Sequence, residues 1–212
     1  MAHPYITFAE EKYMDLLSGE CERLFSGTFI PSHDHLHHGR VWNNAARLME
    51  LLYNKGLISD PCLAEKAIVA AFFHDTGLTV NRGPDHGLES RRICSTFLAA
   101  SGFSEADRAE ILDAVEMHDN KEYSGNSDPS SLAAIISVAD DMDAFGETGI
   151  SRYEEIYSMR GVSASDMPAL IIPNVMSRFR HLESTYSMFP DLVEEMRAGA
   201  GKVTNHFTNK AR

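Results

Sequence analysis

The segment from Leu63 to His74 constrains the fold more than any other part of the chain. It has the length of a helix, and its run Ala67-Ile68-Val69-Ala70-Ala71-Phe72-Phe73 is apolar nearly all round. A helix without a polar face must be covered by other elements, which predicts a buried central helix. The apolar run stops at His74 and Asp75, two side chains that are costly to bury without partners. Their position predicts that something binds both of them.

The rest of the chain also has helical rather than strand periodicity. Apolar residues recur at steps of three and four, and a sustained alternation of apolar and polar residues is not found. The predicted helices cover residues of about 7–25, 34–53, 63–74, 88–100, 104–118 and 132–145, followed by a helical region with breaks near 161–165, at Pro173 and at Pro190. The predicted fold class is all-α, with residues 1–212 forming a single domain.

Charge and hydropathy restrict the classes of partner. The formal net charge of −12 argues against nonspecific binding to nucleic acid or to an anionic membrane. It leaves room for a small phosphorylated substrate, because a bound metal can supply positive charge locally. The N-terminus lacks the pattern of a secretory signal, and a run of roughly 18–20 apolar residues, which a membrane span needs, is absent from the sequence. The three cysteines are widely spaced and contain no Cys-x-x-Cys pair, which favours a reducing, cytoplasmic location.

The His74-Asp75 pair is typical of a metal site, because one divalent cation can bind an imidazole nitrogen and a carboxylate oxygen together. Adjacent helical residues point about 100° apart, so both can reach one cation only near a helix end. Further ligands must come from other helices. His37 and Asp140 are the candidates, and Asp140 directly follows the apolar run Ile135-Ile136-Ser137-Val138-Ala139.

Three elements of the sequence resemble the HD-domain superfamily of metal-dependent phosphohydrolases, in particular its small bacterial members. The elements are His37-x-x-Arg40-Val41, then His74-Asp75-Thr76-Gly77, and last Ala139-Asp140 followed by Met142-Asp143-Ala144-Phe145-Gly146. The resemblance covers about residues 33–152. It implies a helical HD bundle, and residues 153–212 are then expected to form a helical C-terminal extension.

The resemblance implies a ligand set of His37, His74, Asp75 and Asp140, with His86 and His118 added in wider versions of the pattern, where they bind a second metal or the substrate phosphate. Several alternatives stay open on sequence grounds. His38 competes with His37, Asp141 and Asp143 compete with Asp140, and His86 and His118 are equally compatible with polar helix ends. Residues His33 and His35 are expected at the surface or in a second layer around the site. His181 and His206 are expected at the surface.

The donor set contains no thiolate, which suits one or two ions of Mn, Mg, Fe, Zn, Co or Ni. The implied activity is hydrolysis of a phosphate ester or anhydride by a metal-activated water, with a nucleotide or another small phosphorylated metabolite as substrate. Asp75 and Asp143 are the predicted catalytic carboxylates. The predicted phosphate contacts are Arg40, Arg82, Arg91, Lys121 and Arg152. A non-heme di-iron oxygenase and a non-catalytic metal- or nucleotide-binding module are the alternatives, and the acidic helical chain permits a homodimer.

Overall fold

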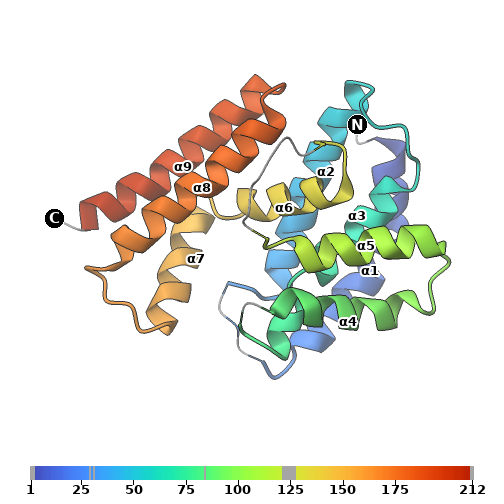
Figure 1. Cartoon of the computed structure of the whole chain (residues 1–212), viewed down its shortest axis with the longest axis horizontal. Helices are drawn as coiled ribbons and strands as arrows, with labels where there is room; N and C mark the ends of the chain where they lie inside the picture. The colour runs from blue at the N-terminus through green and yellow to red at the C-terminus, as the bar shows by residue number, and fades with distance from the viewer. Residues whose placement is uncertain (1–2, 29, 31, 84, 121–127, 211–212) are drawn as a thin grey trace. The chain divides into compact units, whose positions relative to one another are not determined.

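A computed structural model describes residues 3–28, 30, 32–83, 85–120 and 128–210 (Figure 1). The described residues form helices and connecting segments without any strand, which confirms the predicted all-α fold class. They separate into two compact units, Met1–Ala139 and Asp140–Arg212. The prediction of one domain with an extension stays a prediction.

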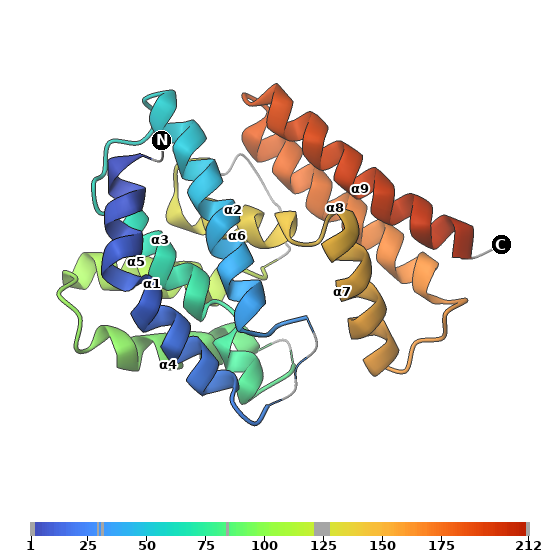
Figure 2. The same cartoon turned by 180° about the vertical axis from the view of Figure 1, so that it is seen from behind.

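The first unit is built around the predicted central helix. Its elements are α1 (Pro4–Phe25), α2 (His35–Asn54), α3 (Leu63–Phe73), the 3-10 helix η1 (Thr76–Thr79), α4 (His86–Leu98), α5 (Glu105–Met117) and most of α6 (Leu132–Met142). Helix α3 packs against α1, α2 and α5, and it lies among them in both views (Figures 1 and 2). Every residue of α3 except Glu65 is buried, which confirms the central helix.

One charged residue is buried within α3, and it is fully paired. The Lys66 Nζ atom lies 2.7 Å from Asp60 Oδ2 and 2.6 Å from Glu110 Oε2. Burial opposes the charge, but the hydrogen bonds that Lys66 donates to these carboxylates outweigh it and raise the pKa of Lys66. The charge therefore ties α3 to α5 and to the segment before α3 without being left unpaired in the core.

The start of α2 is fixed by a side-chain cap. Asp34 stands in extended backbone just before the helix, and its Oδ1 accepts a hydrogen bond of 3.1 Å from the backbone N–H of His37. This bond satisfies one of the free N–H groups of the first turn. Because the cap sets where the helix begins, it also sets which side of α2 carries His37 and which carries His38.

The second unit contains the end of α6 and three further helices, α7 (Gly146–Met159), α8 (Met167–Tyr186) and α9 (Pro190–Lys210). Helices α8 and α9 run side by side, joined by a short connection, and α7 packs against α9 (Figure 2). The predicted breaks near 161–165 and at Pro190 are confirmed.

The predicted break at Pro173 is wrong, because Pro173 lies inside α8. A proline there removes one helical hydrogen bond and its ring crowds the preceding turn. The helix continues because its apolar face is buried at Ile171, Val175 and Phe179. Packing of an amphipathic face supplies most of the stability of a helix in a folded protein, and here it outweighs the local preference.

Gly77 allows η1 to lie directly against the start of α4. A Cβ atom at this position would stand 2.0 Å from the carbonyl oxygen of His86 and 2.5 Å from the backbone nitrogen of Ser90. The Gly77 N–H donates a hydrogen bond of 2.8 Å to Ser90 Oγ. Only glycine fits this approach, which brings the chain just after Asp75 next to His86.

We predict that Gly77→Ala destabilises the metal-free protein by about 1–3 kcal/mol, because the added methyl group forces backbone atoms apart. Chemical denaturation in the presence of EDTA measures the effect. Gly19→Ala is the matched control, since Gly19 is an exposed helical residue whose added Cβ would meet nothing within 4 Å. The control should gain about 0.5–1 kcal/mol from higher helix propensity. A Gly77→Ala protein as stable as the wild type would show that the approach is not tight.

Candidate metal centre

Asp75 occupies the junction between α3 and η1. His74 ends α3, and its backbone N–H still donates to the carbonyl of Ala70 at 2.9 Å. The side chain of His74 is fully buried, and Asp75 is 4% exposed. The end of the apolar helix therefore delivers an imidazole and a carboxylate, next to each other, into the interior of the first unit.

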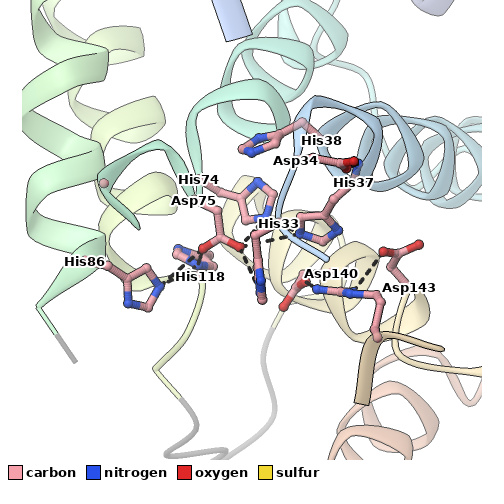
Figure 3. Close-up of polar contacts among 12 residues, drawn as sticks. His33, Asp34, His37, His38, His74, Asp75, His86, His118, Asp140 and Asp143 are labelled. Atoms are coloured by element: carbon pink, nitrogen blue, oxygen red, sulfur yellow. Dashed lines mark hydrogen bonds and ion pairs between the residues drawn. The ribbon is translucent and has the colours of Figure 1, made fainter. Parts of the chain in front are cut away.

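One carboxylate oxygen of Asp75 faces three histidines. Asp75 Oδ2 lies 3.4 Å from the Nε2 atom of His74, 3.5 Å from that of His37 and 3.7 Å from that of His33. The Nε2 atoms of His37 and His74 are themselves 3.1 Å apart. Figure 3 shows these rings pointing toward the carboxylate from α2, from the segment before it and from the end of α3.

The other carboxylate oxygen faces a second pair of histidines. Asp75 Oδ1 lies 3.0 Å from Nε2 of His118 and 3.2 Å from Nε2 of His86 (Figure 3). These two nitrogens are 3.4 Å apart. His74, Asp75 and His118 offer ligand atoms that all lie within 4.8 Å of one another. Asp75 thus stands between two imidazole clusters, with one oxygen directed at each.

Backbone hydrogen bonds determine which ring nitrogens carry the protons. In His74, His86 and His118, Nδ1 lies 2.8, 3.0 and 2.7 Å from the carbonyl oxygen three residues earlier. A carbonyl can only accept, so each Nδ1 carries a proton and donates it. In the neutral ring, the lone pair is then on Nε2, the atom directed at Asp75. Lone pairs converging on a carboxylate require either additional protons or a cation between them.

Close packing of α4 and α5 brings His86 and His118 together. A Cβ atom at Gly87 would lie 2.4 Å from the carbonyl oxygen of Glu116. Glycine therefore lets the first turn of α4 touch the last turn of α5. His86 precedes this contact by one residue and His118 follows it by two, so the contact fixes the distance between the two rings.

The electrostatics of the cluster keep Asp75 ionised. Burial alone would raise the pKa of Asp75, but the neighbouring His74 and the hydrogen bonds from other imidazoles hold it well below its usual value. Burial likewise disfavours charge on His86, yet its hydrogen bond to Asp75 raises the pKa of His86 to about 9. Without a metal, protons on the rings balance the carboxylate. A divalent cation would replace them, since bound imidazole is neutral.

The structure brings His37 rather than His38 to Asp75. The His38 ring is fully buried, and its Nδ1 lies 3.3 Å from the carbonyl of Ala71, the same oxygen that His74 contacts. Burial, together with the neighbouring histidines, lowers the pKa of His38 well below its ordinary value. His38 is therefore a neutral residue that packs behind the rings of His37 and His74.

His33 also faces Asp75, whereas the expected place of this residue was the surface or a second layer around the site. Its side chain is 21% exposed and reaches Asp75 from the segment before α2. Ser32, which precedes it, has a φ of 60°, a left-handed conformation that is uncommon for a residue other than glycine. The sequence feature that could have indicated this role is the presence of four histidines between positions 33 and 38.

The predicted carboxylates Asp140 and Asp143 belong to the second unit together with Arg152. Arg152 Nη1 donates to Asp143 Oδ2 at 2.8 Å, and its Nη2 lies 3.9 Å from Asp140 Oδ1. Arg152 is 7% exposed. The predicted catalytic carboxylate and the predicted phosphate contact are thus paired with each other.

The other predicted phosphate contacts differ in their surroundings. Arg40 lies on α2, three residues after His37, and Arg82 is exposed between η1 and α4. Arg91 donates to Asp113 Oδ1 at 2.6 Å and to Glu116 Oε2 at 3.0 Å, so it links α4 to α5. Lys121 lies outside the described residues.

The expectation that His181 lies at the surface is wrong. His181 is 8% exposed, and its Nδ1 is 2.8 Å from Oδ2 of the fully buried Asp141. The partner lies 40 residues away in sequence, so no local pattern could reveal it. His206 is part-buried and lies 2.8 Å from Glu154 Oε1.

Comparisons with known proteins agree with this architecture. The model of the HD domain family matches residues 36–144. The structure of Bacillus subtilis YpgQ in complex with ADP is similar with a TM-score of 0.63 and 19% identity, covering 95% of this chain and 94% of that one. A Lactobacillus plantarum protein is similar with a TM-score of 0.59 and 18% identity, over 100% of this chain and 95% of that one. A search of the curated proteins finds no match.

These likenesses to solved structures concern the fold. Within the part of the chain that the structure describes, none of the helices has the length and apolar character needed to cross a membrane. The family model spans just over half of the chain and contains His37, His74, Asp75 and Asp140. The chain belongs to the HD domain family.

Proposed function

We propose that this protein is a metal-dependent phosphohydrolase that holds one or two divalent cations around Asp75. The observation that carries the proposal is the set of imidazole nitrogens directed at a single ionised carboxylate. Three of the rings are fixed by Nδ1–H bonds to backbone carbonyls, so their Nε2 lone pairs are available to a cation. The HD domain family belongs to the superfamily of metal-dependent phosphohydrolases. A donor set of imidazoles and carboxylates fits such an enzyme.

The residues suit a metal of the Mn, Mg, Fe, Zn, Co or Ni group, since they supply imidazole and carboxylate without thiolate. Asp75 directs one oxygen at each histidine cluster, so its carboxylate would contribute a donor to an ion held by either cluster. When bound, such a cation polarises a phosphoryl oxygen and provides hydroxide near neutral pH by lowering the pKa of a bound water. The chain's own part is to fix the donors, keep Asp75 ionised and exclude bulk water.

We further propose Asp140 as a ligand. It lies on the last turn of α6, a helix that begins in the first unit. The carbonyl of Ala139 accepts a hydrogen bond of 3.0 Å from Asn44 Nδ2 on α2, two turns after His37. Consecutive Cα atoms are about 3.8 Å apart, so this bond also anchors the residue that follows. The position of Asp140 in the HD pattern supports the same assignment.

A nucleotide or another small phosphorylated metabolite is the proposed substrate. YpgQ, whose fold is similar, was crystallised with ADP, which supports a nucleotide. The proposed phosphate contacts are Arg40, Arg82, Lys121 and Arg152, because cationic side chains offset the charge on phosphate oxygens. Asp143 is proposed to orient the attacking water, with Arg152 holding its carboxylate.

A reducing, cytoplasmic location is also proposed. It is supported by Cys21, Cys62 and Cys94, which are free thiols.

The first test of the ligand set combines His74→Ala and Asp140→Asn. We predict that each variant loses bound metal and phosphate release while its helix content stays near that of the wild type. Loss is expected because each change removes one of the proposed donors to the cation. Metal analysis after dialysis, circular dichroism and a phosphate-release assay measure the three quantities.

The matched control is His206→Ala, which removes a histidine of α9 bonded to Glu154 and should leave metal and turnover unchanged. Full metal content and full turnover in either His74→Ala or Asp140→Asn would show that the ligand set is wrong.

A second prediction concerns the number of ions. His118→Ala removes a donor from the Asp75 Oδ1 side and leaves the donors on the Oδ2 side intact. We expect the binding stoichiometry to fall from two ions to one, as measured by calorimetric titration of the metal-free protein with Mn²⁺. An unchanged stoichiometry would place any second ion elsewhere.

Two tightly bound irons without phosphate release from any nucleotide would instead support the di-iron oxygenase, and metal without turnover would support a binding module.

A third prediction concerns substrate. Arg82 is exposed in the segment that connects η1 to His86. Arg82→Ala should raise KM about tenfold for the best substrate of a nucleotide screen, because a charge-assisted hydrogen bond to phosphate is lost. Metal content and kcat should not change. Arg92→Ala, at an exposed arginine paired with Glu89, is the control. Equal KM values for wild type and Arg82→Ala would remove Arg82 from the phosphate contacts.

A further inference from the structure

Helix α8 delivers an arginine to the proposed ligand Asp140, although α8 lies beyond the residues that the HD family model matches. Arg178 Nη1 donates to Asp140 Oδ2 at 3.0 Å. The same nitrogen donates to Asp141 Oδ1 at 2.7 Å. All three residues belong to the second unit. The contact therefore links the end of α6 to the C-terminal helices.

The guanidinium of Arg178 is itself held in place. Its Nε donates to Asn174 Oδ1 at 3.2 Å, one turn earlier on α8, and Asn174 Oδ1 also accepts from the hydroxyl of Tyr153 on α7 at 2.7 Å. The side chain of Arg178 is only 16% exposed. The planar guanidinium group is hydrogen-bonded both to Asn174 and to the aspartates, so it loses little conformational entropy when it orients a carboxylate.

Asp141 and Asp140 both accept a hydrogen bond from Arg178, but their other partners differ. Asp141 is fully buried and has a second partner, because its Oδ2 lies 2.8 Å from Nδ1 of His181. This carboxylate is balanced within α6 and α8, as expected of a structural ion pair. Asp140 receives the same guanidinium on Oδ2, while its Oδ1 is 3.9 Å from Arg152 Nη2, beyond hydrogen-bond distance. Arg178 thus fixes the orientation of the Asp140 carboxylate through its Oδ2 atom.

We propose that Arg178 is a positioning residue of the metal centre, which holds the Asp140 carboxylate in the orientation that binds the cation. This inference rests on the proposed function, in which Asp140 is a ligand. Residues that hydrogen-bond to a metal ligand and orient it commonly contribute to metal affinity, and their removal weakens binding by about 10–100-fold. The C-terminal helices would then contribute to metal binding through this arginine.

The test is a double-mutant cycle on Mn²⁺ affinity, measured by calorimetric titration of the metal-free full-length protein. We expect Arg178→Ala to weaken binding at the affected site by about 10–100-fold. Asp140→Asn loses its metal on dialysis, but its remaining donors should still bind Mn²⁺ weakly at the higher concentrations of the titration. In that background, Arg178→Ala should have little further effect on the affinity, since the carboxylate that Arg178 orients is already gone. A merely structural role would give equal losses in both backgrounds.

Two further variants separate positioning from stability. His181→Ala removes the other partner of Asp141. It should lower the melting temperature but leave the Mn²⁺ affinity within about twofold of wild type, the scatter expected of sites that do not interact. Arg178→Lys keeps the charge but not the fork, so its affinity should fall between those of wild type and Arg178→Ala. If Arg178→Ala does not fold, Arg178→Lys decides the question.

The possible failures are distinguishable. A folded Arg178→Ala or Arg178→Lys protein with wild-type affinity would overturn the inference, as would equal losses in both backgrounds, while Mn²⁺ binding by the wild type would leave the proposed function intact. A wild-type protein that binds no divalent cation would overturn the proposed function and the inference together.

Discussion

The ionised carboxylate of Asp75, faced by imidazole nitrogens on both of its oxygens, is the interaction on which the rest of the structure depends. The Nε2 atoms of His74 and His118 stand 3.4 and 3.0 Å from it, and the Nδ1 atoms of these rings are engaged by backbone carbonyls. An arrangement of lone pairs and negative charge is unfavourable in a protein interior unless protons or cations balance it. The candidate metal centre is therefore a property of the fold and not of a few surface side chains.

The architecture of the first unit serves this arrangement. Helix α3 is buried on all sides, so its end carries His74 and Asp75 into the interior. Two glycines then permit backbone contacts that no other residue would allow, Gly77 against the start of α4 and Gly87 against the end of α5. These close backbone contacts set the spacing of His86 and His118 on one side of Asp75. In the second unit, Arg178 plays a comparable role for Asp140 through a side chain.

Much of this could be predicted from the sequence, for identifiable reasons. The apolar run before His74 has an unmistakable pattern, and burial of its end follows from simple energetics. Three features outside the family pattern could not be predicted, because they depend on tertiary contacts or on an unusual backbone conformation. His181 has its partner 40 residues away. Pro173 lies inside α8 because tertiary packing outweighs its local preference. His33 reaches Asp75 through an unusual backbone conformation at Ser32, which the sequence does not encode in a recognisable motif.

The most direct test of the account is nitrogen NMR of the imidazole rings during titration of the metal-free protein with Zn²⁺. We predict that His74, His86 and His118 keep the proton on Nδ1 throughout. The Nε2 resonances of these three residues and of His37 should move to the positions of metal-bound nitrogen. Saturating Zn²⁺ that leaves these Nε2 resonances unchanged would contradict the central claim that the histidines around Asp75 form a metal centre.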